Sequence, residues 1–99
     1  MFKHLVLWRF SPDIPREEWE GLVEKLNRRF GAMVGQVPGL LKAQTGLNLA
    51  PEGEHHMVLY TEFTSREAME AYQTHPLHLA VKEEMKDAVA GREVLDYWI

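Results

Sequence analysis

The chain has 99 residues, of which 45% are hydrophobic and 26% are charged, as in ordinary soluble domains. Its formal net charge of -4 argues against nucleic acid or an acidic membrane as the main partner. Cysteine is absent, which excludes disulfides, thiolate metal sites and cysteine nucleophiles. No apolar run has the length of a signal sequence or a membrane span. We therefore expect one cytoplasmic domain over residues 1–99, with no nucleic acid and no membrane as partner.

Alternating side chains predict a first strand over residues 2–10. One face carries Phe2, His4, Val6, Trp8 and Phe10, and the other carries Leu5 and Leu7. Both faces are apolar in the middle of the strand, which is typical of a strand inside a sheet rather than at its edge. This strand should therefore be central.

An amphipathic helix is predicted after the turn-rich segment SPDIP. Pro15 suits the first helical turn, and an apolar stripe follows at three- and four-residue steps. The stripe consists of Trp19, Leu22, Val23, Leu26, Phe30, Met33 and Val37. Pro38 and Gly39 should end the helix, although Gly31 and Gly35 weaken its last turns.

Two further strands are predicted in the middle of the chain. Residues 40–49 mix apolar and polar side chains, which indicates an edge strand, and we expect a bulge at Gly46. Residues 55–63 have apolar side chains on both faces, so this strand should be central like the first. His55 and His56 should begin it at an exposed end.

The last part of the chain predicts a broken helix and a final strand. Thr64 and Glu67 have the spacing of a capping box, which opens a helix. Pro76 should end this first segment at His75, and the helix should resume over residues 77–89. We expect Gly91 to end the helix and residues 92–99 to form the last strand.

The order β-α-β-β-α-β, with short right-handed connections, predicts an α+β ferredoxin-like sandwich with an antiparallel sheet. Its helices cover one face of the sheet only. The other face would leave Leu5, Leu7, Val58 and Tyr60, or their alternates, in water. Because such an apolar patch marks an interface, we expect a homodimer that packs sheet to sheet as a dimeric α/β barrel.

The segment YQTHPLH, residues 72–78, gathers an aromatic hydroxyl and two imidazoles around a proline. His78 is a candidate catalytic base and Tyr72 a candidate donor to an enolate oxygen. The two side chains can converge only if the chain turns at His75 and Pro76. Asp96 could then fix the tautomer of an imidazole from the last strand. In the alternative, Tyr72 is a half-buried aromatic and His78 a polar residue at the rim of the helix.

Each of the other candidate binding residues also has a structural alternative. His4 is either a hydrogen-bonded core histidine or a polar group in the same cavity. Trp8 and Met57 either line a hydrophobic pocket or plug it. The remaining aromatic side chains either line the same pocket or fill the core. His75 should lie at the break in the helix and also beside that cavity. The histidine spacing does not favour a metal site, because no three-ligand pattern occurs.

Several segments together resemble the stress-responsive dimeric α/β-barrel (Dabb) family. They are KHLVLWRF, VPGL, EFTSREAMEAY, HPLH and VLDYW, in the family's order and over nearly the whole chain. The resemblance implies a dimeric ferredoxin-like barrel. It also implies kinship with a plant polyketide cyclase of this family, which closes its product ring by aldol condensation without a cofactor.

The resemblance carries over to this chain position by position. The cyclase's catalytic tyrosine and histidine fall on Tyr72 and His78, its first-strand histidine on His4, and its aspartate on Asp96. Its third-strand histidine falls on Met57. His56 is one residue away from that position and should point to the opposite face.

Two classes of function follow from these patterns. The first is a stress-response-type module that binds a small apolar or aromatic molecule without chemistry. The second is a cofactor-free acid–base enzyme, either polyketide cyclase- or lyase-like or a small oxygenase. Oligomer assembly without a ligand is a third alternative. We expect no cofactor, and the sequence does not name a substrate.

Overall fold

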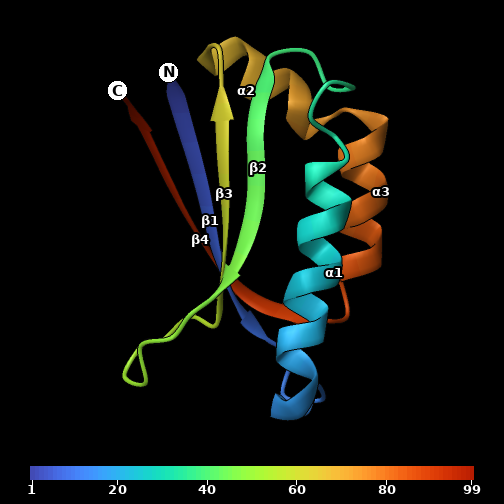
Figure 1. Ribbon diagram of the computed structural model, residues 1–99, viewed down its shortest axis with the longest axis vertical. Helices are drawn as coiled ribbons and strands as arrows, with labels where there is room; N and C mark the ends of the chain where they lie inside the picture. Colours follow the sequence, from blue (N-terminus) through green and yellow to red (C-terminus); the bar gives the residue numbers. More distant parts are fainter.

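The computed structural model describes residues 1–99 and contains a four-stranded sheet with helices on one of its faces (Figure 1). The strands are β1 (Phe2–Phe10), β2 (Leu40–Leu47), β3 (Met57–Phe63) and β4 (Val89–Trp98). The helices are a short 3-10 turn η1 (Arg16–Glu18), α1 (Trp19–Gly31), α2 (Arg66–Gln73) and α3 (Pro76–Met85). None of these helices has the length and apolar character needed to cross a bilayer.

The sheet is antiparallel, with the strand order β2-β3-β1-β4. This is the ferredoxin-like arrangement. The central positions predicted for the first and third strands are therefore confirmed. The two strands hold these positions because only they carry apolar side chains on both faces along most of their length.

The two faces of the sheet differ in their cover. The helix-covered face forms the core, in which Val6, Leu59 and Phe63 from the sheet are almost fully buried beneath Phe30 and Val81 from the helices. The other face has no helix over it (Figure 1). It carries Leu5, Leu7, Val58, Tyr60 and Leu95 in neighbouring register positions. The side chains predicted for the uncovered face, Leu5, Leu7, Val58 and Tyr60, are thus found on it.

The first helix is shorter than the apolar stripe predicted. It ends at Gly31, and the chain continues in turns up to β2. Met33 and Val37 remain buried, and a single turn joins them, in which the Val37 N–H donates to the Met33 carbonyl at 2.9 Å. Gly31 and Gly35 make the helix unfavourable in this segment. The apolar stripe therefore predicted the buried residues correctly but gave a helix that is too long.

The start of β2 packs closely on α2. Gly39 has φ +79°, and a Cβ atom built there would lie 2.5 Å from the Cβ atom of Ala68. Only glycine therefore fits without a shift of α2. The register of β2 shifts between Leu40 and Lys42, whereas Gly46 pairs regularly with Val58, so the bulge predicted at Gly46 is wrong.

A corner separates α2 from α3, as predicted from Pro76. Ser65 rather than Thr64 caps α2, accepting a hydrogen bond from the Ala68 N–H at 3.1 Å. At the corner, His75 is extended and is the N-cap of α3, because its Nδ1 accepts from the Leu77 N–H at 3.1 Å. His75 therefore opens the second segment rather than ending the first.

The last strand begins earlier than predicted. Helix α3 ends at Met85, and β4 already starts at Val89. Gly91, predicted to stop the helix, lies within β4 at φ +67°, where the pairing with β1 shifts between Trp8 and Arg9. A left-handed glycine at such a shift is a bulge that adds one residue to the strand. The sequence did not separate this bulge from a helix cap, since glycine suits both.

The two ends of the chain meet at one end of the sheet, where β1 starts and β4 finishes. The Ile99 N–H donates to the Met1 carbonyl at 3.0 Å, which continues the pairing of β1 with β4. Figure 1 shows both ends together, while the loop between β2 and β3 projects at the opposite end of the molecule.

Candidate functional site

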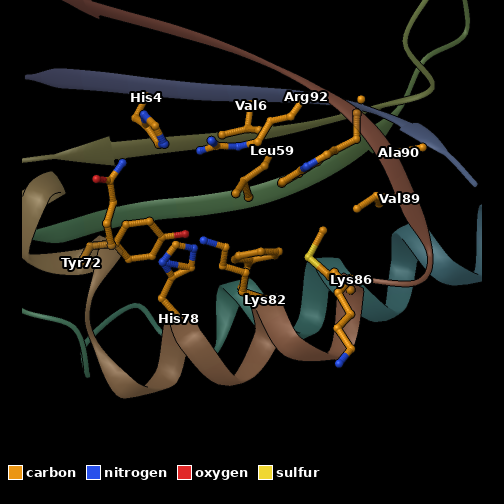
Figure 2. Close-up of a pocket in the computed structure, with 15 residues that line it drawn as sticks. His4, Val6, Leu59, Tyr72, His78, Lys82, Lys86, Val89, Ala90 and Arg92 are labelled. Carbon is orange, nitrogen blue, oxygen red and sulfur yellow. The ribbon is translucent and has the colours of Figure 1, made fainter.

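A cavity of about 430 Å³ lies between the sheet and the helical pair α2 and α3 (Figure 2). Fifteen residues line it, and eight of them are hydrophobic. Its size is that of a pocket for a small organic molecule. The polar members of the wall are therefore the groups that would orient such a molecule.

Tyr72 and His78 lie side by side in this wall. Their ring centroids are 4.2 Å apart and their planes differ by 9°, so the rings are stacked. Tyr72 is in the last turn of α2 and His78 in the first turn of α3, and the corner at His75 and Pro76 brings them together. The turn on which their convergence depends is thus present.

Each of the two rings has a buried polar atom without a hydrogen-bond partner. These atoms are the Tyr72 Oη and the His78 Nδ1. Burial raises the pKa of the Tyr72 hydroxyl, so it remains a donor. Burial, with Lys82 as the next cause, lowers the pKa of His78 to about 4. Near neutral pH both groups are therefore uncharged, and His78 is a weak base.

His4 and Asp96 form a second polar pair across β1 and β4. The His4 Nδ1 lies 2.5 Å from the Asp96 Oδ1, and His4 is 2% exposed. A carboxylate at Nδ1 fixes the tautomer that has its proton on this nitrogen. His4 lines the cavity, and Asp96 contacts its ring at Nδ1 and not at Nε2. Asp96 therefore holds the imidazole of His4, not that of His78.

The structure places three further predicted binding residues, Trp8, Met57 and His75, in different surroundings. Trp8 lines the cavity. Met57 is 1% exposed, packs in the core and is not part of the cavity wall, so it does not plug the site. His75 is also outside the wall, because its ring caps α3. The predictions for Met57 and His75 as binding residues therefore have no support in the cavity's geometry.

His56 was expected to turn away from the helix-covered face, and this is wrong. Its ring stacks on Trp19, the first residue of α1, with centroids 4.3 Å apart. Its Nδ1 accepts from the Phe10 N–H at 2.9 Å. The residue precedes the start of β3, so strand alternation does not govern its direction.

Sequence reasoning missed the basic residues of the wall, Lys82, Lys86 and Arg92. Lys82 follows His78 by four residues, and this helical spacing was a usable signal for a shared face. Arg92 had no such signal, since its direction depends on the bulge at Gly91. No group of three or more histidine, cysteine, aspartate or glutamate side chains lies close enough to hold a metal ion.

Comparison with known proteins identifies the family. The sequence matches the stress responsive A/B barrel domain, Dabb, over residues 2–99. The chain belongs to the Dabb family. The resemblance drawn from the sequence segments is thereby confirmed. A search of the curated proteins found no match for this Dabb chain.

Solved structures share the Dabb fold at low identity. A dimeric protein of unknown function from Bacteroides fragilis is 28% identical, with a TM-score of 0.86, and the match covers 99% of this chain and 95% of that one. A dimeric ferredoxin-like protein from Thermobifida fusca is 20% identical (TM-score 0.78; 99% and 90% covered). The hydroxynitrile lyase of Passiflora edulis is 18% identical (TM-score 0.76; 99% and 92% covered).

Proposed function

We propose that this Dabb protein binds a small, mainly apolar molecule whose carbonyl or hydroxyl group is held by Tyr72 and His78. The observation that carries the proposal is the pair of unpartnered buried atoms, Tyr72 Oη and His78 Nδ1, in the wall of one cavity. A buried polar atom without a partner costs roughly 1–3 kcal/mol. A ligand oxygen that hydrogen-bonds to these two atoms would recover that free energy in the bound state.

The hydrogen-bonding roles of the two groups limit the ligand. The Tyr72 hydroxyl donates, and burial keeps it protonated. The neutral imidazole of His78 donates or accepts at Nδ1, according to its tautomer. A carbonyl oxygen satisfies two donors, and a hydroxyl satisfies one donor and one acceptor. Aromatic ketones, aldehydes and phenols therefore fit the site better than hydrocarbons do.

A homodimer formed through the open face is part of the proposal. Leu5, Leu7 and Val58 are only half-buried on this face, although each lies on a central strand. A second copy packed against it would remove these side chains from water. Two proteins of the same fold are described as dimeric, which supports a dimer of this chain.

Acid–base catalysis without a cofactor is the second candidate function, favoured by the His4–Asp96 pair. In a proton abstraction next to a carbonyl, the Nε2 of His4 would take the proton, and Tyr72 would donate a hydrogen bond to the enolate oxygen. His4 suits this role better than His78, since burial makes His78 a weak base. The similarity of fold to a hydroxynitrile lyase is in keeping with a lyase-like reaction.

Ligand-detected NMR with a panel of aromatic ketones, aldehydes and phenols tests binding. We expect Tyr72→Phe to weaken the hits about tenfold, because one hydrogen bond is lost. Tyr97→Phe, a change at an exposed tyrosine of β4, is the matched control. Equal affinity of Tyr72→Phe and the parent protein for every hit would refute the binding proposal.

The same ketones separate the two candidate functions. In D₂O, an enzyme that removes the proton next to a carbonyl replaces it with deuterium, which NMR detects as loss of that proton signal. Exchange that is lost in both His4→Gln and Asp96→Asn would establish acid–base chemistry. Binding without exchange would leave the protein a binding module.

A further inference from the structure

Two basic side chains without ion-pair partners border the cavity beside Tyr72 and His78. Lys82 comes from α3 and Arg92 from β4, so they stand on opposite walls. Neither takes part in any of the ion pairs of the structure. Figure 2 shows Lys82 extending from α3 toward the two rings, and Arg92 lying along the sheet. Both residues are exposed to solvent, so they form the mouth of the cavity.

The cavity wall contains no acidic residue to neutralise them. Of its fifteen residues, Lys82, Lys86 and Arg92 are cationic, and none is aspartate or glutamate. Asp96 lies behind His4 and is paired with it. A concave site with one sign of charge concentrates the field at its mouth, so anions are drawn in. The positive mouth contrasts with the chain's net charge of -4.

Lys86 differs from the other two cations, although it borders the same cavity. Its side chain points away from the sheet in Figure 2. Its ammonium is 2.6 Å from the Glu83 carboxylate. Lys86 is therefore already paired, and the cations of the wall without an ion-pair partner are Lys82 and Arg92.

The direction of Arg92 follows from the bulge in β4. Val89 and Arg92 are three residues apart, and in a regular strand they would point to opposite faces. The extra residue at Gly91 changes the alternation, so Val89 pairs with Phe10 and Arg92 with Trp8 on the helix-covered face. The left-handed glycine thus places a guanidinium group at the cavity.

From this arrangement we infer that the ligand is a carboxylic acid: an apolar or aromatic body with a carboxylate held between Lys82 and Arg92. The inference rests on the proposed binding function and adds the class of the ligand. The planar guanidinium of Arg92 matches a carboxylate with two parallel hydrogen bonds. The carbonyl or hydroxyl of the same molecule would reach Tyr72 and His78, so the class is an aromatic keto or hydroxy acid.

Matched acid and amide probes test the inference by calorimetry. The panel contains 4-acetylbenzoate, 4-hydroxybenzoate and 6-hydroxy-2-naphthoate, each with its carboxamide, which keeps the shape and removes the charge. We expect the acids to bind about tenfold more tightly than the amides at pH 7 and low salt. Sodium chloride should weaken the acids and leave the amides unchanged. If no acid binds more tightly than its amide, including the case in which nothing binds, the inference is wrong.

Variants locate the charge effect. The double variant Lys82→Gln/Arg92→Gln should reduce the affinity for the acids about tenfold and leave that for the amides unchanged. Lys25→Gln, a change at an exposed lysine of α1 outside the cavity wall, should leave both unchanged. These side chains are exposed, so the variants should fold, which circular dichroism checks. Equal loss in Lys25→Gln would show a general charge effect and overturn the assignment.

The remaining outcomes separate this inference from the proposed function. Acids and amides that bind equally, with both lost in Tyr72→Phe, would overturn the carboxylate and keep the binding function. Acids that depend on Lys82 and Arg92 but not on Tyr72 would keep the carboxylate and refute the role of the two rings. Tighter binding of phenyl phosphate than of every carboxylate would replace the carboxylate by a phosphate ester.

Discussion

The two faces of the sheet differ in whether their polar groups have hydrogen-bond partners. On the helix-covered face, Tyr72 and His78 each keep a buried polar atom without a partner. On the open face, the polar groups satisfy one another. The Lys3 ammonium donates to the Tyr60 Oη at 2.5 Å and to Glu62 at 2.9 Å, and the Tyr60 hydroxyl donates to Glu62 at 2.5 Å.

This difference indicates what each face is suited to contact. The polar groups of the open face already bond to one another, so an apolar partner surface would leave only the third N–H of Lys3 without an acceptor. An unpartnered hydroxyl and imidazole require a partner that brings its own polar atom. This difference supports the proposed dimer through the open face and the proposed small-molecule ligand at the helix-covered face.

The largest expected effect is that of Leu7→Asp on the open face. A carboxylate without a partner in a sheet-to-sheet interface costs about 3 kcal/mol or more, so the dimer should dissociate. Sedimentation velocity over a range of concentrations measures this. Leu49→Asp is the control, because Leu49 is 86% exposed in the loop before β3. A Leu7→Asp protein that stays dimeric with an unchanged Tm would contradict the proposed interface.

Half-buried Tyr60 and buried Tyr72 should respond oppositely to loss of their hydroxyl groups. Tyr60→Phe should lower the free energy of unfolding by about 1–2 kcal/mol, because Lys3 and Glu62 each lose a hydrogen bond. Tyr72→Phe should leave stability unchanged or raise it by up to about 1 kcal/mol, because an unpartnered hydroxyl disappears. Urea denaturation of both variants measures the difference, and the reverse order would refute the comparison.

His78 should make the fold sensitive to acid. Its pKa is lowered from 6.5 to about 4, so between these values the unfolded chain binds a proton that the folded chain does not. The contribution to stability is complete above pH 6.5 and is lost as the pH falls toward 4. With a discount for partial exposure, we expect roughly 1–2 kcal/mol between these limits.

Two measurements check the acid sensitivity. The His78→Phe variant should lose less stability than the parent protein between neutral pH and pH 4.5, by urea denaturation at each pH. An NMR titration of the His78 ring should have its midpoint well below that of a free histidine. A midpoint at the ordinary value would show that the ring is solvated and would remove the contrast with the open face.

The last expected effect is at the bulge that turns Arg92 toward the cavity. Gly91→Ala places a side chain at φ +67°, which costs about 1–2 kcal/mol. The new Cβ atom would contact the Arg9 side chain at an ordinary 3.5 Å, so no clash adds to this cost. Thermal unfolding measures it. Gly21→Ala is the control, because this exposed helical position has open space around it and should gain stability.

The fold was predictable because it follows from periodicity over many residues. Alternation in β1 and β3 gave the central strands, and Pro76 gave the corner that brings Tyr72 to His78. The prediction failed where a single residue determines the local structure. Gly91 suits a helix cap and a bulge equally, and its choice depends on pairing with β1.

The candidate site was predictable only in part for a related reason. Tyr72, His78, His4 and Trp8 were found because their residue types stood out on predicted elements. Lys82 and Arg92 are ordinary surface residues by type, and only the packing of α3 against β4 gives them a shared cavity. The pairing of Asp96 with His4 likewise depends on strand register, which no local pattern reveals.

The meeting of the two chain ends has a consequence for engineering. Because Ile99 pairs with Met1, a short linker could join them without disturbing the sheet. New ends could then open in the loop over residues 48–56, none of which lines the cavity. Such a circular permutant would carry its fusion points at the end of the molecule opposite the original termini (Figure 1). A fluorescent domain fused there would stand away from the cavity and leave the residues that line it as they are.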